Sequence, residues 1–350
     1  MGSPKFTFCI PNLNKIKYLP ACIESMLAQD CQDWRCVFVD GYSTDGSWEY
    51  MEQFASDPRF LLLRGRQQGM YTDWNECLKY VETEYFYFLT SDDTCFPTLV
   101  STTTKALDAH PDIDACHFEF AFINREGTII NPPAGLVNHC DLYFDYNKYA
   151  HRRSGICEFM MHFVYWAVYL TITSLVFRRQ LITKMKGFPT KYGSVGDYDW
   201  TMRLGLFTDV LYLPKLLATW RLYEEQATAQ TNLLQRQEKC MAIAQANLDY
   251  LVETEQSRIL KKNINKQQVL AYIADGYAST SYRQILASKK TNEMAHKLLN
   301  FLQKYPEYAL KKTLNRLSAN RLYPYRPRGE VAQELINDYG LKWPPIRLSN

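Results

Sequence analysis

The sequence predicts an α/β protein, with a mostly parallel sheet flanked by helices and a helical carboxyl-terminal region. Strand-like and helix-like segments alternate through the first hundred residues, as in right-handed strand–helix–strand units around a parallel sheet. From residue 226 onward, apolar residues recur at helical spacing instead. A chain of 350 residues that is 47% hydrophobic can also bury a large core.

Short apolar runs alternate with helical patterns in the first part of the chain. The predicted strands cover residues 6–10, 35–40, 60–63 and 85–90, and the predicted helices cover residues 15–29, 47–54, 71–81 and 99–109. The run at 85–90 is aromatic or aliphatic until its last residue. This composition is typical of an interior strand that is covered on both faces.

The pattern changes twice beyond the fourth strand. Residues 116–217 mix short strands with longer loops, and residues 226–318 are helical throughout. The last thirty residues predict an extended basic strap with a short helix at 329–339. We therefore expect an α/β domain at 1–225, with halves at 1–115 and 116–225, and a helical basic domain at 226–350.

The net charge of +3 hides an asymmetry between these two domains. Residues 226–350 carry 19 Lys and Arg against 10 Asp and Glu, whereas residues 1–225 carry 21 against 27. A basic tail favours contact with an anionic surface such as a membrane leaflet, although the lysine pairs at 261–262, 289–290 and 311–312 could equally be solvated helix faces. No recognised nucleic-acid-binding module accompanies the charge, so nucleic acid is not an expected partner.

The spacing of the cysteines and the hydropathy of the chain indicate where in the cell the protein is expected. The ten cysteines show no zinc-like spacing, and we expect reduced thiols in a cytoplasmic protein without a signal peptide. Residues 159–177 are long enough to span a bilayer. Because they include His162 and Thr173 among other polar residues, we expect a buried strand and a loop there instead.

Two adjacent carboxylates, Asp92 and Asp93, follow the strand at 85–90. Open α/β sheets bind ligands at the carboxyl ends of parallel strands. Hard oxygen ligands suit Mg²⁺ or Mn²⁺, which in turn suit a diphosphate. The alternative is that Ser91 or Asp92 only caps the helix that follows.

Three further polar segments accompany this pair: Ile-Pro-Asn-Leu-Asn at 10–14, Val-Asp-Gly-Tyr-Ser-Thr-Asp-Gly-Ser at 39–47, and Gly-Met-Tyr-Thr-Asp-Trp-Asn at 69–75. Together with Ser-Asp-Asp at 91–93, a version of the DxD motif, they resemble the nucleotide-sugar-binding half of family 2 glycosyltransferases with the GT-A fold. The resemblance covers residues 5–225 and extends to the bacterial surface-polysaccharide members of the family.

The resemblance implies an inverting glycosyltransferase of the hexosyltransferase class. Such an enzyme moves a sugar from a nucleoside-diphosphate donor to a hydroxyl of a saccharide or lipid-linked saccharide, with Mn²⁺ or Mg²⁺. It assigns donor binding to residues 1–115 and acceptor binding to residues 116–225. It also implies lipopolysaccharide or capsule assembly at the cytoplasmic face of the cell membrane, with peripheral membrane contact through the basic tail.

The resemblance also implies roles for individual residues. Asp93 would be the direct metal ligand and Asp92 would be shared between the metal and the ribose. Asp40 can accept a hydrogen bond from a base or a ribose hydroxyl, with Gly41 where relatives often have a second acid. Arg64 and Arg66 either meet the diphosphate or are ordinary surface arginines. The complete set of donor-binding candidates is Pro11, Asn12, Asn14, Asp40, Tyr71, Asp92 and Arg221.

Residues 193–204 resemble the Glu-Asp motif that supplies the general base. Asp197 aligns with the base, Gly196 replaces the usual Glu, and Asp199 is the competing candidate. The base would take the proton of the acceptor hydroxyl as its oxygen attacks. Capping of the helix that begins here is compatible with that role.

Two other stretches fit the same family. Residues 173–179 and 185–188 resemble the strand and the glycine turn before the base, so His162 and Thr173 are candidates to face the acceptor, with a core histidine as the alternative. At 220–223 many relatives carry Arg-x-His, and this chain has Tyr223 at the last position. A third protein ligand for the metal is therefore not assured, and Arg221 becomes the diphosphate candidate.

Two rival functions remain at this level. A nucleotidyltransferase should carry a glycine-rich basic loop after its first strand, and residues 11–14 are not such a loop. A non-catalytic protein that binds sugar nucleotides or saccharides is the second rival, because Gly41, Gly196 and Tyr223 depart from the family pattern.

Overall fold

The computed structural model describes residues 4–132, 141–226, 233–287, 291–318, 322 and 326–348. The chain forms two compact units, the first made of Met1–Phe159, Tyr169–Thr231 and Lys342–Asn350, and the second of Met160–Val168 and Asn232–Leu341. The division into domains at 1–225 and 226–350 stays a prediction. Part of the predicted boundary, residues 227–232, and the lysine pair at 289–290 lie outside the described residues.

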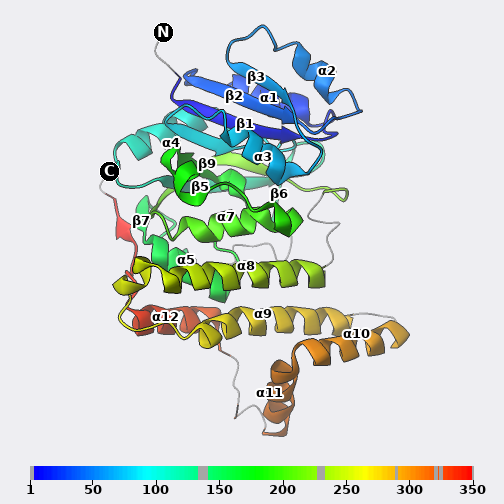
Figure 1. Ribbon diagram of the computed structural model, residues 1–350, viewed down its shortest axis with the longest axis vertical. Coiled ribbons are helices and arrows are strands. Elements are labelled where there is room, and N and C mark those ends of the chain that lie inside the picture. The colour runs from blue at the N-terminus through cyan, green and yellow to red at the C-terminus, as the bar shows by residue number, and fades with distance from the viewer. Residues whose placement is uncertain are drawn as a thin grey trace. The chain divides into compact units, whose positions relative to one another are not determined.

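The first half of the sheet is parallel, as the alternation of elements predicts (Figure 1). Its strands lie in the order β3-β2-β1-β4. The strands are β1 (Phe6–Asn12), β2 (Trp34–Asp40), β3 (Phe60–Arg64) and β4 (Tyr85–Phe88), and the helices between and after them are α1 (Leu19–Leu27), α2 (Ser47–Glu52), α3 (Met70–Leu78) and α4 (Leu99–Asp108).

The second half of the sheet is mixed. Strand β8 (Leu175–Arg178) runs antiparallel to both β4 and β5 (Ala115–Ile123), while β9 (Val210–Arg221) runs parallel to β5. An all-parallel arrangement therefore holds for the first four strands, and the second half combines one parallel pair with antiparallel ones. The remaining elements of this half are β6 (Ile129–Ile130), β7 (His151–Arg153), β10 (Ile346–Arg347), α5 (Gly155–Tyr165), α6 (Gln180–Met185) and α7 (Gly196–Leu204).

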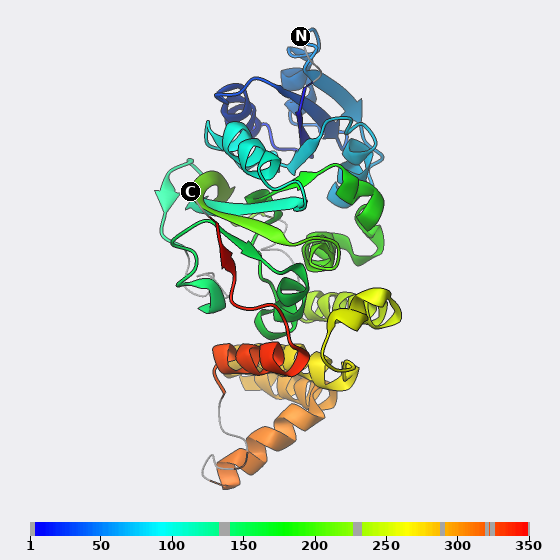
Figure 2. The same ribbon diagram turned by 90° about the vertical axis from the view of Figure 1, so that its left-hand side faces the viewer.

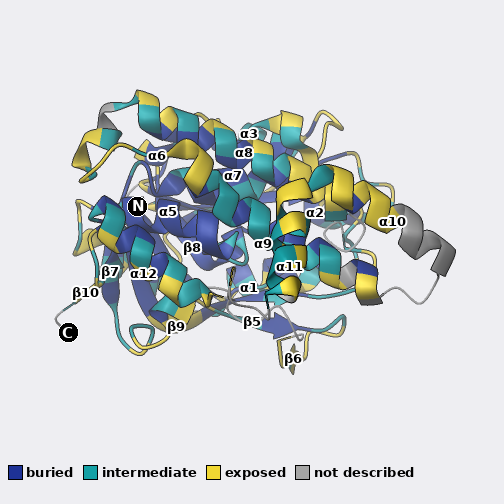
Figure 3. Ribbon diagram, turned by 90° about the horizontal axis from the view of Figure 1, so that it is seen from below, coloured by how far each residue is buried: buried dark blue, intermediate teal, exposed yellow. Residues whose placement is uncertain are grey.

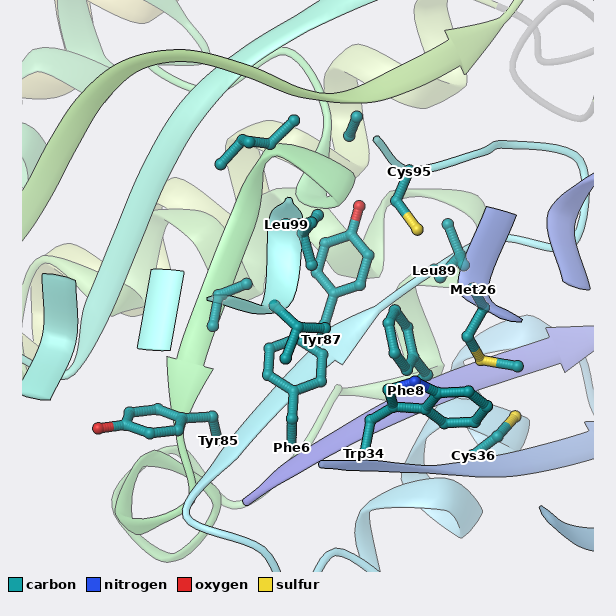
Figure 4. Packing of buried hydrophobic residues seen from close by; sticks show 14 of the residues in the cluster. Phe6, Phe8, Met26, Trp34, Cys36, Tyr85, Tyr87, Leu89, Cys95 and Leu99 are labelled. Atoms are coloured by element: carbon teal, nitrogen blue, oxygen red, sulfur yellow. The ribbon is translucent and has the colours of Figure 1, made fainter. Parts of the chain in front are cut away.

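Strand β4 lies inside the sheet with both faces covered, and the prediction of an interior strand is confirmed. Successive side chains point to opposite faces of a strand. Tyr85 and Tyr87 lie in the core with Phe8 and Trp34 (Figure 4), where the rings of Phe8 and Tyr87 are 6.0 Å apart. On the other face the ring of Phe88 lies 5.3 Å from that of Trp200 and 5.1 Å from that of Trp74.

Residues 159–177 contain less strand than we expect from the sequence. They begin in helix α5, pass through a 3₁₀ turn at Ile172–Ser174, and end in β8. Figure 3 shows α5 and β8 as buried, and a short buried helix cannot be told from a buried strand by hydropathy alone. Among the described residues, no helix has both the length and the apolar character needed to cross a membrane.

The second unit is built from helices, and the predicted helical carboxyl-terminal region is confirmed. Helix α8 buries Cys240, Ala244, Leu248 and Leu251 along one side, as the apolar spacing predicts. Helix α9 packs with α8 and α10, and α10 packs with α11 (Figure 2). The helices are α8 (Leu233–Glu253), α9 (Lys266–Ala287), α10 (Thr291–Lys304), α11 (Pro306–Leu317) and α12 (Arg328–Tyr339).

Candidate functional site

Polar side chains meet at the edge of the sheet where β1 and β2 end. Asn12 and Asp40 are paired at the last position of the two strands. Asn12 Nδ2 donates to Asp40 Oδ1 at 2.9 Å, and the hydroxyl of Ser43 donates to the same oxygen at 2.6 Å. Asp40 is fully buried, so its carboxylate holds the two loops together at this edge.

Arg64, at the end of β3, completes the environment of Asp40. Its Nη1 donates to Asp40 Oδ2 at 2.6 Å, and its guanidinium lies 3.9 Å from the centre of the Trp48 ring. Arg66 is exposed. Arg64 is thus the counter-ion of the buried Asp40 carboxylate. Contact of Arg64 or Arg66 with a diphosphate stays a prediction.

Two other donor candidates, Pro11 and Asn14, lie near the end of β1 and just after it. Pro11 is buried within β1 beside Val39. Asn14 has a positive φ of 52°, a conformation that asparagine tolerates, and its Oδ1 accepts a hydrogen bond from the backbone N–H of Thr44 at 2.8 Å. The loops after β1 and β2 therefore support each other through side chains of the two motifs.

The Asp92–Asp93 pair follows β4 and is tied to the end of β9. Asp93 Oδ1 accepts from the backbone N–H of Arg221 at 2.7 Å, and Oδ2 accepts from the hydroxyl of Thr90 at 2.6 Å. Asp92 Oδ2 accepts from the hydroxyl of Tyr223 at 2.5 Å. Helix α4 begins only at Leu99 and has Thr98 as its N-cap, so the interpretation of Ser91 or Asp92 as that cap is wrong.

Burial decides the protonation of Asp93. Its side chain is 2% exposed, and desolvation, with the charge of Asp92 as a second cause, raises the pKa of Asp93 to about 8. The hydrogen bonds from Thr90 and Arg221 oppose this rise. A cation that approached the pair would favour the ionised carboxylate.

Arg221 joins β9 to the acidic pair through its side chain as well. Its Nε donates to the carbonyl of Asp92 at 2.6 Å, and its Nη1 donates to the carbonyls of Asn124 and Arg125 at 3.0 and 3.1 Å. The residue is buried. These bonds position the loop after β4, and contact of Arg221 with a diphosphate stays a prediction.

The protein atoms at this edge could bind a divalent cation only if a substrate supplied further ligands. Asp92 and Asp93 supply carboxylate oxygens, which suit Mg²⁺ and Mn²⁺. Within the parts of the chain that the structure describes, no cluster of three or more His, Cys, Asp or Glu could hold a metal. Phosphate oxygens and water would therefore have to complete the coordination, as is usual for Mg²⁺ in proteins.

Asp197 lies at the start of α7, in contact with the donor half. Its Oδ1 accepts from the hydroxyl of Tyr71, on α3, at 2.9 Å, and from the backbone N–H of Tyr198 at 2.9 Å. A Cβ added at Gly196 would come within 2.9 Å of the Tyr71 ring. The glycine that replaces the family's Glu therefore makes room for the ring that bonds Asp197.

The competing acid, Asp199, is buried and engaged by Arg203. Arg203 Nε donates to Asp199 Oδ2 at 2.6 Å, and its Nη2 donates to the carbonyl of Gly187 at 2.9 Å. This ion pair fixes the turn before α7. The geometry thus favours Asp197, which is partly exposed, over Asp199 as the group that could meet an acceptor.

The two acceptor candidates from residues 159–177 are both buried. His162 has no exposed surface and Thr173 is 1% exposed. The carbonyl of Thr173 accepts from the hydroxyl of Tyr87 at 2.6 Å. Burial of both side chains accords with the alternative that these are core residues.

The sequence analysis assigns no role to two polar residues at this edge. Lys15 contacts Asp92, and the only hint in the sequence is its position directly after the first motif. Asp73, on α3, is buried, and burial raises its pKa to about 6. A Cβ at Gly65 would lie 2.3 Å from Asp73 Oδ1, so this carboxyl fits against a backbone that only glycine allows to approach.

Comparison with known proteins agrees with the arrangement of these motifs. Residues 7–167 match the family model of glycosyl transferase family 2. This part of the chain is therefore similar to glycosyltransferase family 2. The match agrees with the predicted enzyme class over this part of the chain.

Relatives of known name resemble parts of the chain. A PGL/p-HBAD biosynthesis glycosyltransferase of Mycobacterium bovis is 35% identical over 98 residues, which are 27% of this chain and 38% of that protein. The uncharacterized glycosyltransferase YibD of Escherichia coli K12 is 27% identical over 120 residues, 34% of this chain and 35% of its own. The matched segments therefore span little more than a third of the length of either relative.

A solved structure resembles nearly the whole chain. Staphylococcus aureus TarS 1–349, crystallised in complex with UDP-GlcNAc, superposes with a TM-score of 0.64 at 18% identity and covers 96% of this chain and 89% of TarS 1–349. This likeness concerns the fold. The predicted GT-A fold with a helical region after it is confirmed.

Proposed function

We propose that this chain is a family 2 glycosyltransferase that transfers a sugar, with inversion, from a nucleoside-diphosphate donor to a hydroxyl of a saccharide or lipid-linked saccharide. The observation that supports it most directly is the hydrogen bond between Tyr71 and Asp197. This bond joins helix α3, which begins in the polar segment 69–75, to Asp197, the residue that aligns with the general base of the family.

In this proposal Asp197 is the general base. It takes the proton of the acceptor hydroxyl while the hydroxyl oxygen attacks the anomeric carbon, and the bond from that carbon to the diphosphate breaks. Hydrogen bonds from Tyr71 and from the backbone of Tyr198 orient the carboxylate. The amino-terminal end of α7 further favours its negative charge.

The donor would bind at the edge formed by β1, β2 and β4. Candidates for its contacts are the residues that the sequence predicts: Pro11, Asn12, Asn14, Asp40, Tyr71, Asp92 and Arg221. A divalent metal held by Asp93 and Asp92 would supply charge neutralisation for the departing diphosphate. The complex of TarS with UDP-GlcNAc supports a uridine-diphosphate sugar as the first donor to test.

The cellular setting is proposed from the resemblance and the charge. The excess of Lys and Arg in residues 226–350 supports peripheral contact with an anionic leaflet. The nine cysteines within the described ranges are free, which supports a reducing, cytoplasmic compartment. A role in lipopolysaccharide or capsule assembly follows from the resemblance alone.

Donor hydrolysis by the purified chain tests the proposal. A panel of nucleotide sugars is incubated with Mn²⁺, and release of the nucleoside diphosphate is measured. Asp197→Asn should abolish turnover, by at least ~100-fold, while donor binding survives. Asp145→Asn is the matched control, because that side chain is 90% exposed and, among the described residues, forms a salt bridge with Lys148 at the surface.

Two results would decide against the proposal in different ways. Turnover that persists in Asp197→Asn would remove the base assignment. Donor binding without turnover in the unaltered chain, across the panel and with candidate acceptors, would instead support the non-catalytic alternative.

A further inference from the structure

Lys15, in the loop after β1, places its ammonium group beside the acidic pair. Its Nζ lies 3.5 Å from Asp92 Oδ2 and donates a hydrogen bond to the hydroxyl of Tyr223. Tyr223 in turn donates to the same Asp92 oxygen at 2.5 Å. The ammonium therefore stands against the carboxylate that would also bind a divalent cation.

Aromatic contacts hold the lysine in this place. Lys15 Nζ lies 4.8 Å from the centre of the Tyr223 ring, and that ring lies 5.0 Å from the ring of Tyr18. The guanidinium of Arg221 lies 4.9 Å from the centre of the Tyr18 ring. The backbone N–H of Lys15 donates to the hydroxyl of Ser47 at 3.2 Å, so both ends of the residue are anchored.

The two basic residues at the acidic pair differ in what they can still bind. The guanidinium of Arg221 is directed at three backbone carbonyls. The ammonium of Lys15 contacts one hydroxyl and one carboxylate oxygen, on a flexible stem with a side chain 25% exposed. An ammonium with three donors can exchange such partners for phosphate oxygens at little structural cost.

We propose that Lys15 binds the diphosphate of the donor and that, before the donor arrives, it is the counter-ion of Asp92. Tyr223 is the positioning residue that aligns the two. The inference rests on the proposed donor class. Lys15 and a divalent cation repel each other at Asp92, so a diphosphate that engages Lys15 makes room for the metal. Metal and diphosphate then each raise the affinity of the other by the same factor.

Substitution of Lys15 in the full chain tests this with two simple probes. Mn²⁺ alone is titrated by electron paramagnetic resonance, and inorganic pyrophosphate alone is titrated by ³¹P resonance in the presence of EDTA. Lys15→Met should raise the affinity for Mn²⁺ and lower that for pyrophosphate, each by about 5-fold, as loss of one partly exposed ion pair allows.

Matched variants separate charge from structure. Lys17→Met removes the same charge from an exposed neighbour and should leave both affinities within about 2-fold. Lys15→Arg keeps the charge and should retain pyrophosphate binding. Tyr223→Phe removes only the hydroxyl and should lower the affinity for pyrophosphate by about 3-fold, with an unchanged melting temperature as the check on folding.

Several outcomes would overturn the inference. One is that Lys15→Met and Lys17→Met change the affinities for Mn²⁺ and pyrophosphate equally. The others are a fall in Mn²⁺ affinity in Lys15→Met and the absence of saturable pyrophosphate binding in the unaltered chain. None of these measurements requires sugar transfer. A failure of the donor-hydrolysis assay therefore refutes the proposed function while leaving these ion-binding results to be judged separately.

Discussion

Replacing Asp93 by Asn should stabilise the fold at high pH while it destroys the site. Burial raises the pKa of this carboxyl to about 8, whereas in the unfolded chain an aspartate ionises near 4. Between these two pH values the folded protein keeps a proton that the unfolded chain releases. Each rise in pH across that window therefore favours unfolding.

The size of the effect follows from the width of the window. At ~1.4 kcal/mol per pH unit, the loss of stability from about pH 4 to about pH 8 is at most ~6 kcal/mol. Asparagine cannot ionise, and its amide can keep both of the hydrogen bonds that the carboxyl makes to Arg221 and Thr90. The stability of Asp93→Asn relative to the unaltered chain should thus increase by ~2–4 kcal/mol from pH 5 to pH 8.

Urea unfolding in EDTA, followed by tryptophan fluorescence, measures this difference at each pH. EDTA is needed because a bound cation would ionise Asp93 and remove the effect. Asp145→Asn, at an exposed carboxylate, should show no such pH dependence. A stability difference for Asp93→Asn that is the same at pH 5 and pH 8 would refute the reasoning, since Asp93 would then ionise in its usual range despite its burial. Donor turnover should fall at least ~100-fold in the same variant.

Three further substitutions test the contacts around the site. Tyr71→Phe removes the hydrogen bond to Asp197 and should lower kcat by about 10-fold with little change in KM for the donor; an unchanged kcat would contradict the positioning role. Gly196→Ala brings a Cβ within 2.9 Å of the Tyr71 ring and should cost ~1–3 kcal/mol in urea unfolding as well as activity. Arg221→Lys cannot keep the fork of hydrogen bonds to backbone carbonyls, including that of Asp92, and should destabilise the fold by ~2 kcal/mol; wild-type stability would show that these bonds matter little.

Local composition was sufficient to predict the elements around the donor edge. Strands β1, β2 and β4 are runs of mostly apolar residues between polar turns. The composition of such a run is enough to predict that the strand is buried. The same reasoning fails in part at 159–177, where helix α5 extends to Tyr165 and strand β8 begins only at Leu175. A short, mostly apolar segment has no periodicity that separates the two conformations.

The sequence by itself determined the α/β architecture, the order of the four motifs and the acidic pair at the end of β4, because each depends on neighbours within a few residues. Only the tertiary structure decided which side chains contact the acidic pair and Asp197. Lys15 and Tyr223 are 208 positions apart in the chain, and Tyr71 and Asp197 are 126 apart. No local pattern encodes such contacts, because they arise when β9 and α7 pack beside elements from the opposite end of the domain.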